Sequence, residues 1–195
     1  MRRCLMVLAA VMVVAGCSDP KAANESNFKA AIQQHLDTVY PRCYVIADFP
    51  YSTKGGFFNR SKEMGALAAV GVVSVKEIDS KEKSYELTEL GKTSYKENAG
   101  TGFSGQKLSG LCFGKASVTA VTQFSEPAEI LGHKVSQVNY EYTVSDLPDW
   151  AQTAQVQGAF AELKKDVQSK DKPRKALDTV LLTNKGWVHE RQFRK

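Results

Sequence analysis

The N-terminal residues constrain the location and the fold of this chain more than any other segment does. Residues 1–3 include two arginines, and an unbroken apolar run follows from Cys4 to Ala15. A run of this length matches the hydrophobic region of a secretory signal peptide and is too short to span a bilayer as a helix. The sequence therefore predicts export from the cytoplasm, with residues 1–16 removed as a signal peptide.

The apolar run ends in Val14, Ala15, Gly16 and Cys17, which resembles the lipobox of bacterial lipoproteins. The resemblance implies cleavage before Cys17 and acylation of that cysteine, so that the membrane is a partner through more than one acyl chain, the condition for stable anchoring. An ordinary secretory signal that ends in a cysteine is the alternative. Because Ser18 rather than aspartate follows, we expect the periplasmic face of the outer membrane rather than the inner membrane.

The mature chain divides into a tether and a domain. Residues 17–27 are mostly small and polar, which is typical of a short lipidated tether. Residues 28–195 are numerous enough to bury a hydrophobic core of their own. We therefore expect one globular domain over 28–195.

Two cysteines remain for the folded region. Of the four in the chain, Cys4 leaves with the signal peptide and Cys17 is the acylated residue, which leaves Cys43 and Cys112. Cysteines in an oxidising envelope usually pair, so we expect a Cys43–Cys112 disulfide, with two buried free thiols as the alternative. Closing such a loop would stabilise the fold by roughly 3–5 kcal/mol.

The first half of the domain carries helical and strand patterns in turn. Apolar residues from Phe28 to Tyr40 recur at helical spacing, with Ser26 as the expected cap and Pro41 as the stop. A second helix is expected from Asn59 to Gly71. It is followed by a valine-rich strand, a charged turn, a return strand and a short helix capped by Thr88.

This order of elements, over Asn59 to Lys96, resembles the recognition helix and wing of winged-helix proteins. DNA binding would need excess positive charge to neutralise phosphates. Residues 76–97 instead hold five lysines against six acids. We therefore expect no nucleic-acid partner and interpret the unit as a scaffold. An anchored nucleic-acid binder remains a third hypothesis, which predicts a basic stripe on that face.

The second half of the domain predicts an antiparallel sheet. Residues 98–110 are rich in glycine and serine and are expected to form a loop. Strands are expected near 118–124 and 138–144, with a connection over 127–134, and a final hairpin over 177–189. Between them lies a helical region whose expected core contacts are Trp150, Val156, Phe160 and Leu163. The fold class is thus α+β: N-terminal helices with a wing-like hairpin, then an antiparallel sheet with a helical insertion.

No motif predicts catalysis, a cofactor or a metal site. Gly100, Gly102 and Gly105 spell a dinucleotide-binding pattern, but no valine-rich strand precedes it and no helix follows. The three histidines His35, His133 and His189 lack the spacing of a zinc site. We therefore expect that the protein is not an enzyme. The alternative, an envelope hydrolase, requires a deep cleft with His133 or His189 beside a carboxylate.

The C-terminal segment carries an excess of positive charge. From residue 164 onward there are ten basic residues against four acidic ones. Such a cluster suits an acidic envelope protein, an anionic lipid head group or a polyanionic polymer, whereas a solvated helix end and loop is the simpler interpretation. The expected contact residues are Lys164, Lys165, Lys170, Lys172, Arg174 and Lys175.

The segments "LCFGKASV" and "VSDLPDWA" resemble a family of uncharacterised proteobacterial lipoproteins, and that resemblance implies no activity. The sequence as a whole favours a lipid-anchored binding or structural module of the cell envelope. An inhibitor or immunity-type lipoprotein is its most concrete form.

Overall fold

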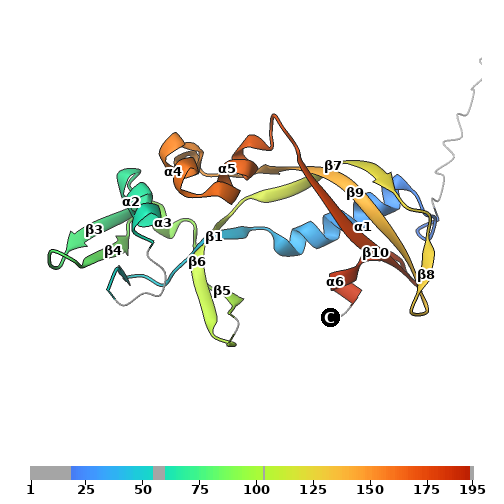
Figure 1. The fold of residues 1–195 in the computed structure, drawn as a ribbon, viewed down its shortest axis with the longest axis horizontal. Coiled ribbons are helices and arrows are strands. Elements are labelled where there is room, and N and C mark those ends of the chain that lie inside the picture. The colour runs from blue at the N-terminus through green and yellow to red at the C-terminus, as the bar shows by residue number, and fades with distance from the viewer. Residues whose placement is uncertain (1–18, 55–59, 103, 194–195) are drawn as a thin grey trace, which may run out of the picture.

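The computed structural model of the protein describes residues 19–54, 60–102 and 104–193. The expected signal peptide and Cys17 lie outside these residues. The molecule is elongated, with α1 and a long sheet toward one end and α2 with short strands toward the other (Figure 1). Helices are combined with antiparallel sheets, so the class is α+β. None of the helices within the described ranges combines the length and hydropathy that a membrane crossing requires.

Helix α1 (Glu25–Val39) forms where the apolar spacing predicts it. Its cap is Asn24, whose side chain accepts a hydrogen bond from the Asn27 amide over 2.9 Å, and not Ser26 as expected. Asn24 lies in extended backbone just before the helix, where a short polar side chain can reach the first free N–H groups. The helix ends at Val39, before Pro41, as expected.

Residues 19–22 lie within the expected tether but are bound to the body of the protein. Asn27 Nδ2 donates hydrogen bonds to the carbonyl oxygens of Asp19 (2.9 Å) and Ala22 (2.8 Å). The indole N–H of Trp187 donates to the Lys21 carbonyl oxygen over 3.1 Å. The chain is therefore attached to the domain from its first described residues.

The long sheet has the strand order β11-β10-β9-β7, with every pair antiparallel. Its strands are β7 (Lys115–Phe124), β9 (His133–Ser145), β10 (Arg174–Thr183) and β11 (Gly186–His189), which confirms the predicted pairs. The expected connection over 127–134 contains a further strand, β8 (Ala128–Ile130), which pairs with β9. It forms because the chain reverses tightly at Leu131 and Gly132, both with positive φ.

Helix α1 packs across this sheet and creates the first of two buried clusters, here called the α1 core. Gln33 fixes the helix against β7: its Nε2 donates to the Ala116 carbonyl, and its Oε1 accepts from the Val118 amide over 2.8 Å. The α1 core consists of Phe28, Ala31, Ile32, Leu36, Tyr40, Ala116, Val118, Val138, Tyr140, Tyr142, Val144, Val180 and Trp187.

The other end of the molecule is built from two small antiparallel sheets and helix α2 (Ser61–Ala69). One sheet has the order β1-β6-β5, with β1 (Arg42–Ile46), β5 (Tyr95–Thr101) and β6 (Lys107–Phe113). The other has the order β2-β4-β3, with β2 (Tyr51–Ser52), β3 (Val73–Glu77) and β4 (Lys83–Leu87). Helix α3 (Glu89–Lys92) follows β4, and Thr88 caps it as predicted.

The prediction of a loop over 98–110 is wrong, because most of these residues belong to the β5–β6 hairpin. Glycine, which usually weakens a strand, is required here at Gly110. A Cβ on Gly110 would lie 2.0 Å from the Val45 carbonyl oxygen of β1. The missing side chain lets β1 approach β6 closely enough to pair.

Three short helices connect β9 to β10: the 3-10 helix η1 (Asp149–Gln152), α4 (Ala154–Ala159) and α5 (Ala161–Gln168). They pack toward α2 and close the second buried cluster, the α2 core. As expected, Trp150, Val156, Phe160 and Leu163 are buried there. The other members of the α2 core are Val45, Ala47, Met64, Leu67, Val72, Val73, Tyr85, Leu111, Phe113 and Ala151. A final helix, α6 (Glu190–Phe193), follows β11.

Candidate functional site

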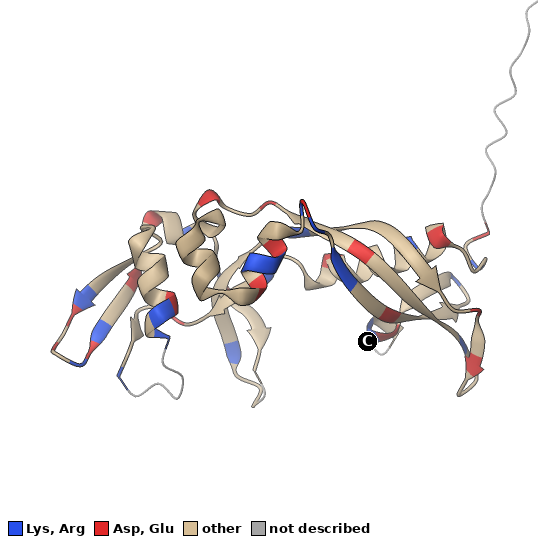
Figure 2. Cartoon of the chain, turned by 45° about the horizontal axis from the view of Figure 1, so that its top comes forward, with Lys and Arg blue, Asp and Glu red and all other residues tan. Residues whose placement is uncertain are grey.

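The predicted basic contact residues lie on α5, on the start of β10 and on the turn between them (Figure 2). The five lysines Lys164, Lys165, Lys170, Lys172 and Lys175 are exposed, whereas Arg174 is half-buried. We call residues 164–175 the basic segment. Its lysines face solvent near the middle of the elongated molecule.

Part of this positive charge is neutralised within the protein. Lys165 Nζ lies 2.7 Å from Glu162 Oε1, and Lys175 Nζ lies 3.5 Å from Glu141 Oε1. Arg174 pairs with Glu162 at 3.0 Å and also with Asp166. Among the residues that the structure describes, no carboxylate lies within 4.0 Å of the ammonium groups of Lys164, Lys170 or Lys172. These three lysines supply the surplus charge of the site.

A surface pocket of about 360 Å³ opens within the basic segment. Its lining residues are Lys165, Gln168, Lys172, Pro173, Arg174 and Lys175. Four of these six residues are cationic, so the pocket suits an anionic group, such as a carboxylate of a partner protein.

Asp166 holds the basic segment in place from inside. The residue is fully buried, and its carboxylate pairs with Arg174. Asp166 Oδ2 accepts hydrogen bonds from the hydroxyl groups of Tyr44 (2.6 Å) and Tyr40 (3.3 Å). A buried carboxylate is tolerated only with such partners. The start of β10 is therefore fixed to α5 and to the chain around β1.

The surroundings of Tyr44, Tyr40 and Glu162 shift the pKa values of these side chains. Burial, followed by the hydrogen bond to Asp166, raises the pKa of Tyr44 above its ordinary value. Burial and the nearby Asp166 charge also raise the pKa of Tyr40. Both phenols therefore remain donors at neutral pH. On the surface, hydrogen bonds from Lys165 and then Arg174 lower the pKa of Glu162 to about 2.

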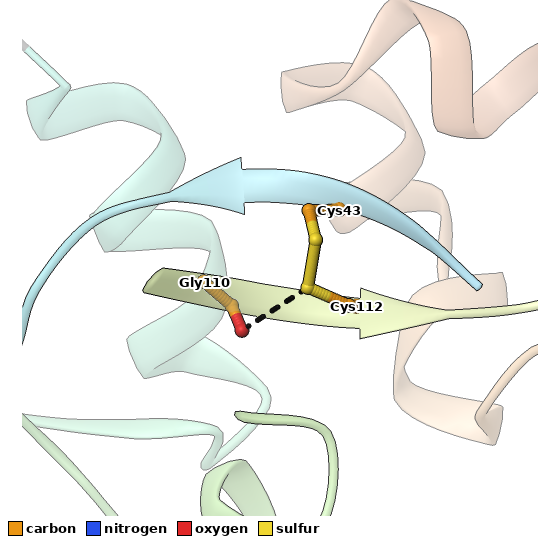
Figure 3. The surroundings of a disulfide bond; sticks show 3 residues. All are labelled: Cys43, Gly110 and Cys112. Atoms are coloured by element: carbon orange, nitrogen blue, oxygen red, sulfur yellow. Dashed lines mark hydrogen bonds between the residues drawn. A yellow bond between two sulfur atoms is a disulfide. The ribbon is translucent and has the colours of Figure 1, made fainter. Parts of the chain in front are cut away.

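Cys43 and Cys112 form the predicted disulfide (Figure 3). The two residues face each other in the register of β1 and β6, so the bond joins neighbouring antiparallel strands. Cys112 Sγ also lies 3.5 Å from the Gly110 carbonyl oxygen. A disulfide sulfur carries no proton, so this second contact is one of packing. Both sulfurs are bonded, which leaves neither as a nucleophile.

Two of the three histidines meet in the α1 end of the molecule, which the sequence did not predict. The rings of His35 (α1) and His189 (β11) stack with centroids 3.6 Å apart. His189 Nε2 lies 3.5 Å from Asp178 Oδ2, and the Tyr140 hydroxyl group donates to the same oxygen over 2.7 Å. His189 and then Tyr140 lower the pKa of Asp178. His189 is only 1% exposed, so its imidazole is inaccessible to a substrate, although the Asp178 side chain is 32% exposed.

The third histidine, His133, lines a pocket of about 420 Å³ together with Glu190. Most other lining residues are apolar: Ile130, Leu131, Val135, Leu181 and Phe193, with Thr179. His133 packs edge-to-face on the Phe193 ring, with centroids 5.0 Å apart. Throughout the described part of the chain, no group of three or more histidine, cysteine or acidic residues is arranged to hold a metal ion.

Sequence reasoning missed the residues that organise the basic segment. In the sequence, Asp166 is one of only four acidic residues from residue 164 onward, and Tyr44 belongs to no motif. The two are 122 positions apart, and no local pattern signals their contact. Comparisons of the chain with protein-family models, curated proteins and solved structures found no match.

Proposed function

We propose that the protein is a lipid-anchored component of the bacterial cell envelope, held at Cys17, which binds an acidic partner through the basic segment. The signal sequence and lipobox support the anchor. One observation above all supports the partner surface: Lys164, Lys170 and Lys172 have no carboxylate partners among the described residues. The segment that carries them is held by the buried framework of Asp166, Arg174 and the two tyrosine hydroxyl groups.

The framework matters because a preorganised surface loses less conformational entropy on binding. Asp166 and its tyrosine donors fix the backbone from which the lysines project. The partner class that fits is an envelope protein with an acidic patch or a polyanionic polymer. An inhibitor or immunity-type lipoprotein is the most concrete form of the proposal.

Charge reversal tests the partner surface. In the full-length protein, the triple variant Lys164→Glu, Lys170→Glu, Lys172→Glu should lose the envelope partner that crosslinking recovers with the wild type at physiological salt. The matched control is Lys76→Glu, Lys81→Glu, Lys96→Glu, which makes the same charge change at exposed lysines near α2. Recovery of the same partner by both triples, or of none by the wild type, would contradict the proposal. Mass spectrometry of Cys17 tests the anchor separately.

The hydrolase alternative has one supporting observation, the shared pocket of His133 and Glu190. Within the described residues, no hydroxyl group or thiol is hydrogen-bonded to His133, and the walls are mainly apolar. A serine or cysteine nucleophile that a histidine activates lies within hydrogen-bond reach of the imidazole, and the described residues place none there. We therefore favour the binding module.

The wing-like unit around β3 and β4 enters the proposal as a scaffold. Two of the five lysines over residues 76–97 are paired with acids: Lys83 Nζ lies 3.0 Å from Glu77, and Lys92 Nζ lies 2.6 Å from Glu89. A phosphate-binding stripe would need these cations unpaired. Helix α5, which carries the start of the basic segment, belongs to the proposed binding surface instead.

A further inference from the structure

The turn between β8 and β9 exposes apolar side chains where a hairpin normally carries polar ones. Leu131 is 94% exposed and Ile130 is 55% exposed. Leu131 also has a φ of 51°, in the left-handed region that favours glycine or asparagine. A leucine here is unfavourable both in backbone conformation and in solvation. Within the folded chain it gains no burial in return.

The apolar surface continues from the turn onto the adjoining sheet. Val135 of β9 and Leu181 of β10 line the pocket beside the turn, and Phe193 of α6 borders it while 45% exposed. Exposed apolar patches of this kind mark contact sites for another protein or for a membrane. The turn therefore has the character of a contact surface.

The position of this surface indicates which contact it makes. Figure 1 shows the β8 hairpin at the same end of the long axis as the start of the described chain. Residues 19–22 are bound to that end through Asn27 and Trp187. Cys17 is two residues before Asp19 in the sequence, and two residues of chain span at most roughly 7 Å. A lipid on Cys17 would hold this end of the molecule beside the bilayer.

We propose that the tip of the β8–β9 hairpin, Ile130 and Leu131, is a second membrane contact that inserts into the bilayer to which Cys17 is anchored. This inference rests on the proposed function, in which a lipid on Cys17 anchors the protein. A phospholipid bilayer fits better than a second copy of the chain because the contact is a projecting turn. Stable protein interfaces bury about 800 Å² on each partner.

Charge near the turn indicates what kind of lipid contact this is. Glu129 and Lys134 face each other across the hairpin in the β8–β9 register, so their charges offset each other, and Glu190 adds a carboxylate to the adjoining pocket. Insertion is then driven by apolar burial, which the screening of charges by salt does not weaken. Binding of the tip should not require anionic lipid.

A fluorescent probe in the full-length, anchored protein tests the contact. Ile130→Cys is labelled with an environment-sensitive fluorophore and reconstituted in vesicles that contain nitroxide-labelled phospholipid. The matched control is Ile78→Cys: Ile78 is 51% exposed in the β3–β4 turn, toward the opposite end of the molecule. We expect the Ile130→Cys probe to be quenched several-fold more strongly than the control. Adding Leu131→Asp should reduce its quenching to the control level.

Each outcome has a distinct meaning when Cys17 is analysed by mass spectrometry in the same samples. Equal quenching at both positions with acylated Cys17 would overturn the tip contact and leave the anchor intact. Unmodified Cys17 would overturn the anchor, and the tip contact as stated here with it. A blue-shifted Ile130→Cys probe that the nitroxide lipid does not quench would assign the tip to a second copy and overturn the proposal. Because Leu131 lies outside both cores, Leu131→Asp should leave the circular dichroism spectrum unchanged.

Discussion

The hydroxyl group of Tyr44 donates a 2.6 Å hydrogen bond to Asp166 Oδ2, and Tyr40 donates to the same oxygen over 3.3 Å. Tyr44 packs against the α2 core, whereas Tyr40 belongs to the α1 core. One carboxylate on α5 is therefore bound by tyrosines of both buried clusters. This oxygen is therefore one point at which the two ends of the molecule are joined.

The buried ion pair should be a major determinant of stability. Arg174→Ala removes the cation from fully buried Asp166, and an unpaired buried charge costs about 3–5 kcal/mol. The control Lys175→Ala removes a solvent-exposed lysine that pairs with Glu141 at 3.5 Å, and should cost about 1 kcal/mol or less. Urea denaturation of both variants measures the difference. Equal unfolding free energies would show that Asp166 is satisfied without Arg174.

The disulfide should raise the free energy of unfolding by an amount that depends on the size of the loop it closes. Cys43 and Cys112 are 69 residues apart, for which chain entropy predicts a stabilisation of about 3–5 kcal/mol. The double variant Cys43→Ala, Cys112→Ala should lose this much in chemical denaturation. The wild type under reducing conditions should behave alike. A reduced wild type as stable as the oxidised one would contradict this account.

Two glycines should respond in opposite directions to the same substitution. Gly110→Ala places a Cβ 2.0 Å from the Val45 carbonyl oxygen, so β1 must shift, at a cost of about 1–3 kcal/mol. Gly65→Ala lies inside α2 with nothing within 4 Å of the new Cβ. It should stabilise the protein by about 0.5–1 kcal/mol. Thermal unfolding of the two variants distinguishes them, and destabilisation by Gly65→Ala would contradict the open space there.

Acid should destabilise the protein through Asp178. His189 and Tyr140 lower the pKa of this carboxyl group in the folded state. Its contribution to the unfolding free energy is therefore present above the ordinary carboxyl range and is lost as pH falls below about 4. Asp178→Asn should flatten the dependence of Tm on pH in that range.

Glu162 provides the comparison for this titration. Its pKa falls to about 2, but its side chain is 44% exposed, so solvent screens most of the benefit. Glu162→Gln should therefore change the acid dependence less than Asp178→Asn does. The reverse order would assign the acid sensitivity to the basic segment.

Local patterns predicted the local elements. The spacing from Phe28 to Tyr40 predicted α1, and the expectation that only Cys43 and Cys112 remain in the folded region predicted the disulfide. Composition failed at β5 and β6, because it cannot show that Gly110 serves strand pairing rather than a loop. The contacts of Asp166 and the stack of His35 on His189 join distant positions. Such contacts depend on tertiary packing, which periodicity does not encode.

The attachment of residues 19–22 to Asn27 and Trp187 has a consequence for how an anchored molecule reaches its partners. A long flexible linker would let the body sample every orientation above a membrane. Here almost no free chain separates the body from Cys17. In the proposed anchored form, the dimensions of the folded body would limit the distance between the basic segment and the lipid surface, and an acidic partner would have to come within that distance to be bound.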